Sequence, residues 1–212
     1  MSDPAALDQA DLETALDFVN TVGVSHGKPF DDFGTTRQVI DWLHERTGLD
    51  PALVPADSTA VLARVARART AFRELWDATV EQRQPDLAAL KEVNRVLRHR
   101  SVLELEDGVD TAGHGLHLTS RFTGDEIDCA LAELAEPLVR TVGGADAELA
   151  RICDNDECRW VFFDDSRTHR KRWCDMASCG NRAKAARHRA RAKATEPSAG
   201  QAAPVTAPER PG

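Results

Sequence analysis

Residues 153–179 have the sequence CDNDECRWVFFDDSRTHRKRWCDMASC, which contains four of the five cysteines of the chain. They form two pairs, Cys153-x4-Cys158 and Cys174-x4-Cys179, with fifteen residues between the pairs. Two close pairs of thiols let two short loops each supply two ligands to one tetrahedral ion. Because four thiolates leave no open position for water, an ion held in this way is structural rather than catalytic. We therefore predict one structural zinc ion bound by these four cysteines.

Two disulfides, or thiols that merely pack, are the alternatives to a metal site. The first residues, MSDPAALDQADLE, lack the basic start and the apolar run of a secretory signal, and no apolar stretch is long enough to span a membrane. We therefore expect a cytoplasmic protein, in which disulfides are disfavoured. An iron–sulfur cluster also needs cysteines, but paired cysteines among basic residues favour zinc. The fifth cysteine, Cys129, lies among Ile127, Leu131 and Leu134, which predicts a buried, inert thiol.

The segment between the two cysteine pairs is aromatic and basic. Residues 159–163, RWVFF, are typical of a strand, and a turn at 164–166 leads to a return through 170–173. A hairpin of this kind would bring the two pairs together. In so small a module the aromatic side chains are better suited to a miniature core than to stacking on bases; these are Trp160, Phe162 and Trp173.

A basic segment follows the last cysteine. Alanine and arginine favour helix, so we predict one from residue 180 to about 193. Lys and Arg recur through 182–193 without one acidic residue, whereas solvated helices usually mix charges. A solvated run of charge remains the alternative to contact with nucleic acid. The residues that we expect to reach phosphates or base edges are Arg182, Lys184, Arg187, His188, Arg189 and Arg191.

The charge of the chain is divided unevenly. The whole chain carries a net charge of −8, yet residues 151–194 carry twelve Lys or Arg against six Asp or Glu. A basic element on an acidic body is typical of a protein that contacts a polyanion through one part of its chain.

The first 150 residues have the periodicity of amphipathic helices. We expect helices over 11–22, from Thr35 or Thr36 to Gly48, from Asp57 or Ser58 onward, from Pro85, and over 124–142, followed by a short helix from Asp146. Alternation in 102–106 and 116–119 predicts a β-hairpin.

The predicted fold class is mainly α (α+β), with a multihelical N-terminal domain that carries one β-hairpin and a small four-cysteine zinc finger that ends in a basic helix. We place the domains at 1–150 and 151–194. Residues 195–212 are rich in Pro, Ala and Gly and are expected to form a disordered tail.

Two stretches resemble known families. Residues 174–182, CDMASCGNR, resemble the CGNR zinc finger, which is named for the last four letters, and the resemblance extends from Arg151 to Arg191. Residues 15–21, ALDFVNT, resemble the opening of the ABATE domain, which accompanies this finger in bacterial stress-induced transcription regulators. The resemblance implies a DNA-binding regulator with a helical domain for effector sensing or dimerisation.

We therefore expect double-stranded DNA as the partner, and a homodimer, because a single short helix contacts few base pairs. Asp17, Asn20 and Thr21 either line an effector pocket or cap and bridge helices. The alternative function is a zinc-stabilised module that binds RNA or protein without sequence-specific DNA binding.

An enzyme is the third class that we considered. The histidines of the first 150 residues form no ligand-spaced pair on a helix, and His114-x-x-His117 near the hairpin is the one pair of interest. Neither a nucleophile motif nor a phosphate-binding glycine loop is present. We expect no catalytic activity.

Overall fold

The computed structural model describes residues 9–25, 27–99, 102–107, 115–121 and 123–195. The predicted tail beyond Thr195 and His114 of the histidine pair lie outside the described residues. By its internal contacts the chain divides into two compact units, Met1–Cys174 and Asp175–Gly212.

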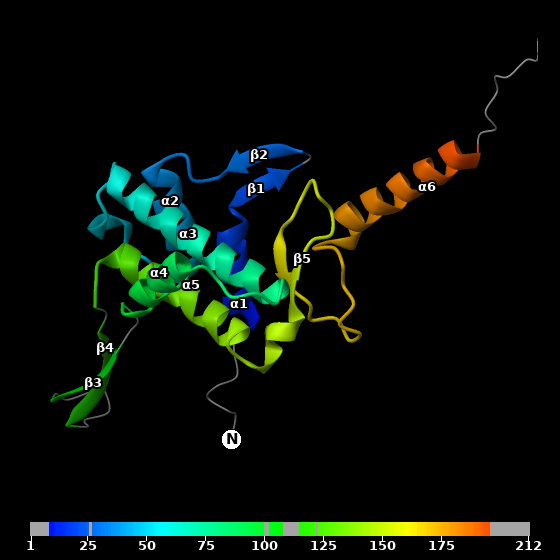
Figure 1. Cartoon of the computed structure of the whole chain (residues 1–212). Coiled ribbons are helices and arrows are strands. Elements are labelled where there is room, and N and C mark those ends of the chain that lie inside the picture. Colours follow the sequence, from blue (N-terminus) through cyan, green and yellow to red (C-terminus); the bar gives the residue numbers. More distant parts are fainter. Residues whose placement is uncertain (1–8, 26, 100–101, 108–114, 122, 196–212) are drawn as a thin grey trace, which may run out of the picture. The chain divides into compact units, whose positions relative to one another are not determined.

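Among the residues that the structure describes, the first unit contains five α-helices: α1 (Gln9–Asn20), α2 (Thr36–Thr47), α3 (Thr59–Val80), α4 (Leu87–Leu97) and α5 (Glu126–Val142). Helix α3 packs against α4 and α5, and α1 packs against α5 (Figure 1). The largest fully buried side chains include Phe18, Phe72 and Trp76. Because each large apolar side chain that leaves water stabilises the fold by roughly 1.5–3 kcal/mol, this core holds the helices together.

The ends of the helices confirm the capping residues expected from the sequence. The side chains of Thr35 and Ser58 accept hydrogen bonds from the N–H groups of Gln38 and Val61 at the starts of α2 and α3. Gly48 ends α2 with φ of 69°, a left-handed conformation that favours glycine. Helix α4 starts at Leu87, after Asp86, so Pro85 precedes the helix instead of occupying its first turn.

Three antiparallel two-stranded ribbons accompany the helices in the described part of the chain. The predicted hairpin is confirmed as β3 (Val102–Asp107) and β4 (Leu116–Arg121). A second hairpin, β1 (Val22–Ser25) and β2 (Lys28–Asp31), stands where we expected a loop. The third ribbon pairs β5 (Ala150–Ile152) with β6 (Val161–Phe163).

The unexpected hairpin β1–β2 is anchored by Arg69 of α3. Both Nη atoms of Arg69 donate to the carboxylate of Asp31, at 2.9 and 2.6 Å, and Nη1 also donates to Oγ1 of Thr21 at 3.0 Å. The guanidinium is almost wholly buried and its carbon Cζ lies 5.2 Å from the centre of the Phe33 ring. A paired, buried cation of this kind fixes the hairpin to the helices.

Strand β6 pairs differently from our expectation. Its partner is β5, with Val161 opposite Ile152, whereas we predicted a return strand at 170–173. The pair β5–β6 belongs to the first unit and packs on its helices. Trp76 of α3 donates its indole N–H to the carbonyl oxygen of Arg151 at 3.0 Å. The helices thus bury the apolar side chains of β5 and β6. A hairpin formed only by residues between the two cysteine pairs would have had no such surface to pack against.

The remaining short elements are 3₁₀ turns at η1 (Pro51–Leu53) and η2 (Ala145–Leu149), of which the second is the short helix expected at Asp146. The second unit contains a π-helical turn, η3 (Met176–Gly180), and α6 (Asn181–Thr195), which confirms the predicted helix after the last cysteine. Within the described residues, no helix combines the length and apolarity that crossing a membrane demands.

Candidate metal centre and basic helix

The loop of the first cysteine pair is closed by backbone hydrogen bonds. The N–H of Cys153 donates to the carbonyl oxygen of Trp160 at 2.8 Å. The carbonyl oxygen of Asn155 accepts from the N–H groups of Cys158 and Arg159, at 2.8 and 3.0 Å. Arg159 has φ of 59°, which turns the chain sharply after the second thiol. The loop therefore holds Cys153 and Cys158 in a fixed relation.

Cys174 approaches this loop through the segment that precedes it. The N–H of Asp154 donates to the carbonyl oxygen of Arg172 at 2.9 Å, and Nε of Arg172 donates to the Asp154 carboxylate at 2.5 Å. The sulfur atoms of Cys158 and Cys174 lie 3.7 Å apart. The third thiol is thus held beside the first pair.

Cys179 lies on η3, whose start is capped by Asp175. The carboxylate of Asp175 accepts from the N–H groups of Ala177 and Ser178, at 3.2 and 2.8 Å. Its carbonyl oxygen accepts from the N–H of Gly180 at 3.0 Å. A capping aspartate satisfies N–H groups that the start of a helix leaves unpaired, so it fixes the turn that carries Cys179.

The three residues after Cys179 each support the turn. A Cβ atom at Gly180 would lie 2.7 Å from the sulfur of Met176, so glycine leaves room for that side chain. Nδ2 of Asn181 donates to the carbonyl oxygen of Ala177 at 3.0 Å. Nη2 of Arg182 donates to Sγ of Cys179 at 3.3 Å. A guanidinium beside a sulfur favours the thiolate, which is the form that binds metal.

The four thiols come together in one cluster. All four sulfur atoms lie within 4.8 Å of one another; three of the cysteines are buried and Cys174 is half-buried. Zinc bonds of about 2.3 Å in a tetrahedron would place the sulfur atoms roughly 3.8 Å apart, close to the 3.7 Å between Cys158 and Cys174. That separation is far longer than a disulfide bond, and none of the four cysteines forms a disulfide. The donor set fits one structural zinc ion.

The fifth cysteine, Cys129, is half-buried rather than buried. Burial, together with the acidic side chains around it, raises the pKa of its thiol to about 11. The thiol is therefore protonated at neutral pH, which agrees with an inert side chain.

The aromatic residues form less of a core than we expected. Phe162 is buried, but Trp160 is exposed and Trp173 is half-buried. The prediction was wrong for Trp160, because β5 and β6 bury other apolar residues, such as Ile152 and Val161, against the helices. The rings also carry cations, with Nζ of Lys171 5.3 Å from the centre of the Phe162 ring and Cζ of Arg172 5.1 Å from that of Trp173.

A buried carboxylate organises the loop between β6 and Cys174. Asp164 is fully buried and accepts hydrogen bonds from the N–H and hydroxyl of Ser166 and from the N–H of Lys171. Burial by itself raises the pKa of Asp164, but these hydrogen bonds outweigh it and hold the pKa below its ordinary value. The sequence predicted a turn at residues 164–166, within the stretch FDDSR, but it did not identify Asp164 as the buried carboxylate that organises this turn.

The basic residues of α6 divide between two sides of the helix. Lys184, Arg187, His188 and Arg191 are exposed and line one shallow hollow, as their spacing of three and four residues requires. With 3.6 residues per turn, Arg189 and Arg182 lie on the opposite side. Arg189 is exposed, whereas Arg182 is half-buried and reaches Cys179. We call the first four residues the cationic face.

Comparison with known proteins agrees with this geometry. The family model described as "CGNR zinc finger" matches residues 150–192. The ABATE model, described as "Putative stress-induced transcription regulator", matches residues 12–145, which is well over half of the chain. The chain belongs to the ABATE family. The resemblance to both families is thereby confirmed, and a role as a regulator fits the ABATE description. A search of curated proteins found no match to the chain.

The polar residues near the end of α1 serve different purposes in the ABATE domain. Asn20 is buried, and its amide exchanges two hydrogen bonds with the backbone of Val161 in β6, at 2.9 and 3.0 Å. Thr21 donates to the carbonyl oxygen of Phe18 and accepts from Arg69. Asp17 is exposed, and partial burial raises the pKa of its carboxyl. Asp17 and Asn20, but not Thr21, line a hollow of about 270 Å³ that Trp160, Asp165 and Lys171 also border.

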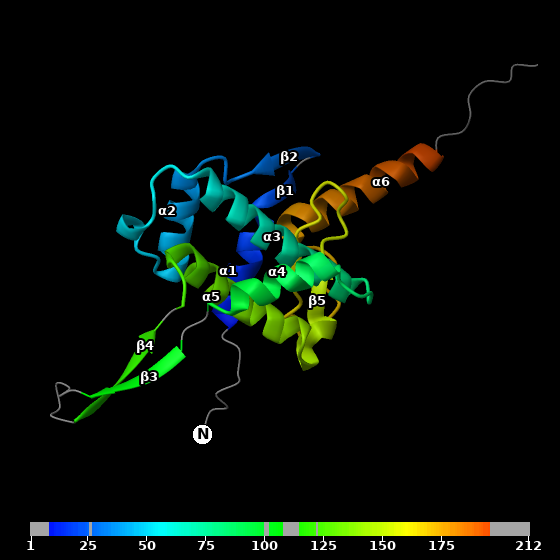
Figure 2. The same cartoon turned by 60° about the vertical axis from the view of Figure 1, so that its left-hand side comes forward.

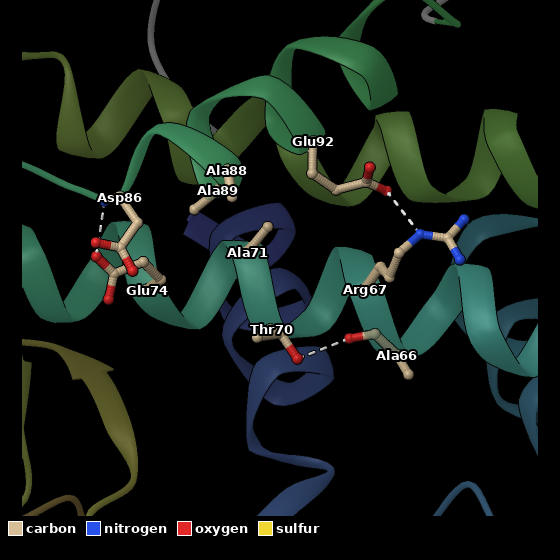
Figure 3. A pocket seen from close by; sticks show the side chains of 9 residues that line it. All are labelled: Ala66, Arg67, Thr70, Ala71, Glu74, Asp86, Ala88, Ala89 and Glu92. Carbon is tan, nitrogen blue, oxygen red and sulfur yellow. Dashed lines mark hydrogen bonds and ion pairs between the residues drawn. The ribbon is translucent and has the colours of Figure 1, made fainter.

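A second hollow of the ABATE domain lies between α3 and α4 and was not anticipated from the sequence. It measures about 540 Å³, with small side chains such as Ala71 and Ala89 on its floor (Figure 3). The charged residues at its rim already interact with their neighbours. Arg67 forms an ion pair with Glu92 at 4.0 Å, and the carboxylate of Glu74 accepts a hydrogen bond from the N–H of Asp86 at 3.0 Å. Within the described residues, the four cysteines form the group that could hold a metal ion.

Proposed function

We propose that this ABATE protein is a DNA-binding transcription regulator of the bacterial cytoplasm, in which zinc fixes the finger and the cationic face of α6 contacts double-stranded DNA. The observation that carries the proposal is the alignment of Lys184, Arg187, His188 and Arg191 on one exposed side of a helix. Cations on such a side attract phosphates, and an α-helix fits the major groove.

The part played by zinc follows from the turn that begins α6. Cys179 lies two residues before the helix, so a metal bond to its sulfur fixes the point from which α6 starts. Arg182 then has a supporting role, because its guanidinium faces that sulfur. The thiolates bind the ion and exclude water from it, while the exposed cations of the helix meet the nucleic acid.

The test compares two arginines on opposite sides of the same helix. Fragments that the zinc-loaded protein retains from a pool of genomic DNA would be labelled, and their affinity measured by fluorescence anisotropy at several salt concentrations. Each phosphate contact contributes roughly −0.9 to the slope of log affinity against log salt. Arg187→Ala should weaken binding and reduce the slope by about that amount, whereas Arg189→Ala, the matched control, should change both much less.

If both variants lost the same amount of DNA affinity, only the total charge of the helix would matter, and a specific contact face would be refuted. An affinity that does not respond to salt would refute phosphate contact altogether. Recovery of RNA or of one protein partner, with no preferred duplex fragment, would instead support the alternative of an RNA- or protein-interaction module.

The proposed role of the ABATE domain is to bind an effector or to assemble the dimer, rather than to catalyse a reaction. The hollow lined by Asp17 and Asn20 supports effector binding, because it lies beside the strand that leads from the metal loop. A screen of small metabolites by thermal shift would test this, since a compound that binds there should stabilise the native chain and lose its effect in Asp17→Ala.

A further inference from the structure

One hollow of the first unit reaches a ligand of the metal centre. Helix α3 packs against β5, as Figure 2 shows, and α1 packs against β6. The hollow of about 270 Å³ that Asp17 and Asn20 line is bordered on its other side by residues in and after β6, and Cys174 is one of them. The other three thiol ligands are buried and do not line it, whereas Cys174 is half-buried. A small molecule that enters the hollow therefore comes to Cys174 first.

The two half-buried cysteines of the chain differ in the state of their sulfur. A sulfur that binds zinc is a thiolate, and thiolates rather than thiols attack oxidants. Cys129 is not one of the ligands, and burial raises the pKa of its thiol to about 11, which keeps it protonated at neutral pH. Cys174 therefore combines a thiolate with access. Cys129 has access alone, and the three buried ligands are thiolates without access.

A second sulfur lies within reach of Cys174. Sγ of Cys158 is 3.7 Å from Sγ of Cys174. A disulfide bond measures about 2.05 Å, so the two atoms need to approach each other by about 1.7 Å. Cys158 belongs to the first cysteine pair and Cys174 to the second. A bond between them would therefore take one ligand from each pair, and neither pair would remain complete.

We propose that Cys174 is a site of oxidation by hydrogen peroxide, and that its oxidation empties the zinc centre. Sγ of Cys174 attacks one oxygen of the peroxide, the O–O bond breaks, and a sulfenic acid forms while hydroxide leaves. Sγ of Cys158 then attacks Sγ of Cys174, so that an S–S bond forms and a second hydroxide leaves. The two thiolates lose two electrons, which reduce the peroxide, and water protonates the hydroxides. Sulfurs joined in a disulfide no longer supply the thiolates that hold the ion.

The consequence for the helix rests on the proposed function. Zinc there fixes the turn at Cys179 from which α6 begins, so loss of the ion should weaken contact with DNA. The oxidation itself involves neither DNA nor an effector. Its test can therefore fail while DNA binding stands, or succeed while DNA binding is refuted.

The experiment treats the full zinc-loaded chain with hydrogen peroxide at a series of concentrations. A chromogenic chelator measures the released zinc, and mass spectrometry after alkylation of the remaining thiols identifies the oxidised cysteines. The first oxidised species should contain a disulfide between Cys158 and Cys174, and zinc should be released in step with it. Cys129 should still be alkylated at that stage, and a dithiol reductant should restore zinc binding.

Two variants test the route through the hollow. Asp17→Phe places a large side chain at its border and should slow the oxidation of Cys174 several-fold. The matched control Asp11→Phe introduces the same side chain at an exposed position of α1 that does not line the hollow, and it should react like the wild type.

Three results would overturn the proposal: oxidation of Cys129 or of a buried ligand before Cys174, zinc that stays bound after Cys174 is oxidised, or equal rates in Asp17→Phe and the wild type. If Asp17→Phe fails to bind zinc, the order in which the cysteines of the wild type are oxidised decides the question.

Discussion

Replacing Asn20 by alanine should destabilise the protein far more than an average asparagine substitution. The amide donates to the carbonyl oxygen of Val161 and accepts from its N–H, and both groups are buried. Each hydrogen bond contributes about 1 kcal/mol, and each buried group that is left unpaired costs about 1–3 kcal/mol. We expect Asn20→Ala to lower the free energy of unfolding by roughly 2–4 kcal/mol, and the melting temperature by roughly 5–15 °C.

The metal loop should respond to the same change, because Cys153 donates to the carbonyl oxygen of Trp160, the residue next to Val161. Urea denaturation of the zinc-loaded chain gives the free energy, and competition with a chromogenic chelator gives the zinc affinity. Asn94→Ala, at an exposed position of α4, is the matched control and should stay within about 0.5 kcal/mol of the wild type. If Asn20→Ala also stays within that margin, the paired amide does not hold β6 in place and the reasoning fails.

Three further predictions concern charge, capping and metal. Burial by itself raises the pKa of Asp31, but the bond from Arg69 outweighs it, so the folded pKa lies below the ordinary value of 3.8. The ionised carboxylate therefore stabilises the fold at neutral pH, by about 1 kcal/mol for a half-exposed pair, and this contribution disappears as the pH falls from about 4 through the folded pKa. In urea titrations the stability gap between the wild type and Asp31→Asn should close over that interval; a gap that widens on acidification would contradict the argument. Asp175→Ala removes the cap of η3 and should cost about 1 kcal/mol, seen as weaker zinc binding in chelator competition, and unchanged affinity would argue against the cap. Chelation of zinc should expose the amides of residues 153–160 and 174–180 to hydrogen exchange while α1 to α5 and β6 keep their protection, and uniform loss of protection would show that the helical core depends on the metal.

The local features of the fold could be predicted from the sequence. Caps such as Thr35 and Ser58 accept hydrogen bonds from N–H groups two or three residues away. The residues that determine where a helix starts therefore lie within one turn of one another in the sequence. The hairpin β3–β4 was predictable for the same reason, since alternation within each strand sets its two faces. The spacing of Lys184, Arg187, His188 and Arg191 likewise puts these four residues on one side of α6.

Features that depend on distant partners could not be predicted. Hairpin β1–β2 is held by Arg69, which lies 38 residues beyond Asp31 in the sequence. Strand β6 lies against β5 and the helices because Asn20 and Trp76 bind backbone atoms that no side-chain pattern records. Because Val161 packs against the helices, the side chain of the preceding residue, Trp160, is left exposed.

The four zinc ligands form the part of the site that sequence specified most completely. Their spacing depends on short loops, and the loops close through bonds among near neighbours such as Asn155 with Cys158 and Asp175 with Ser178. The supporting groups were harder to identify. Asp164 was passed over as one polar residue of a turn, and Arg182 was grouped with the DNA-contacting cations although its guanidinium also faces a ligand sulfur.

The two hydrogen bonds from Asn20 of α1 to β6 use main-chain atoms of the strand, and this has an evolutionary consequence. An asparagine that binds peptide groups tolerates other apolar residues at position 161, apart from proline, which has no N–H, so mutations in the strand can accumulate without breaking these hydrogen bonds. A recombination event that divided the gene between the helices and β5 would not yield an independent finger, because β5 and β6 would lose the surface on which they fold. Such a protein should therefore diversify by point substitution in its exposed helix rather than by exchanging whole modules.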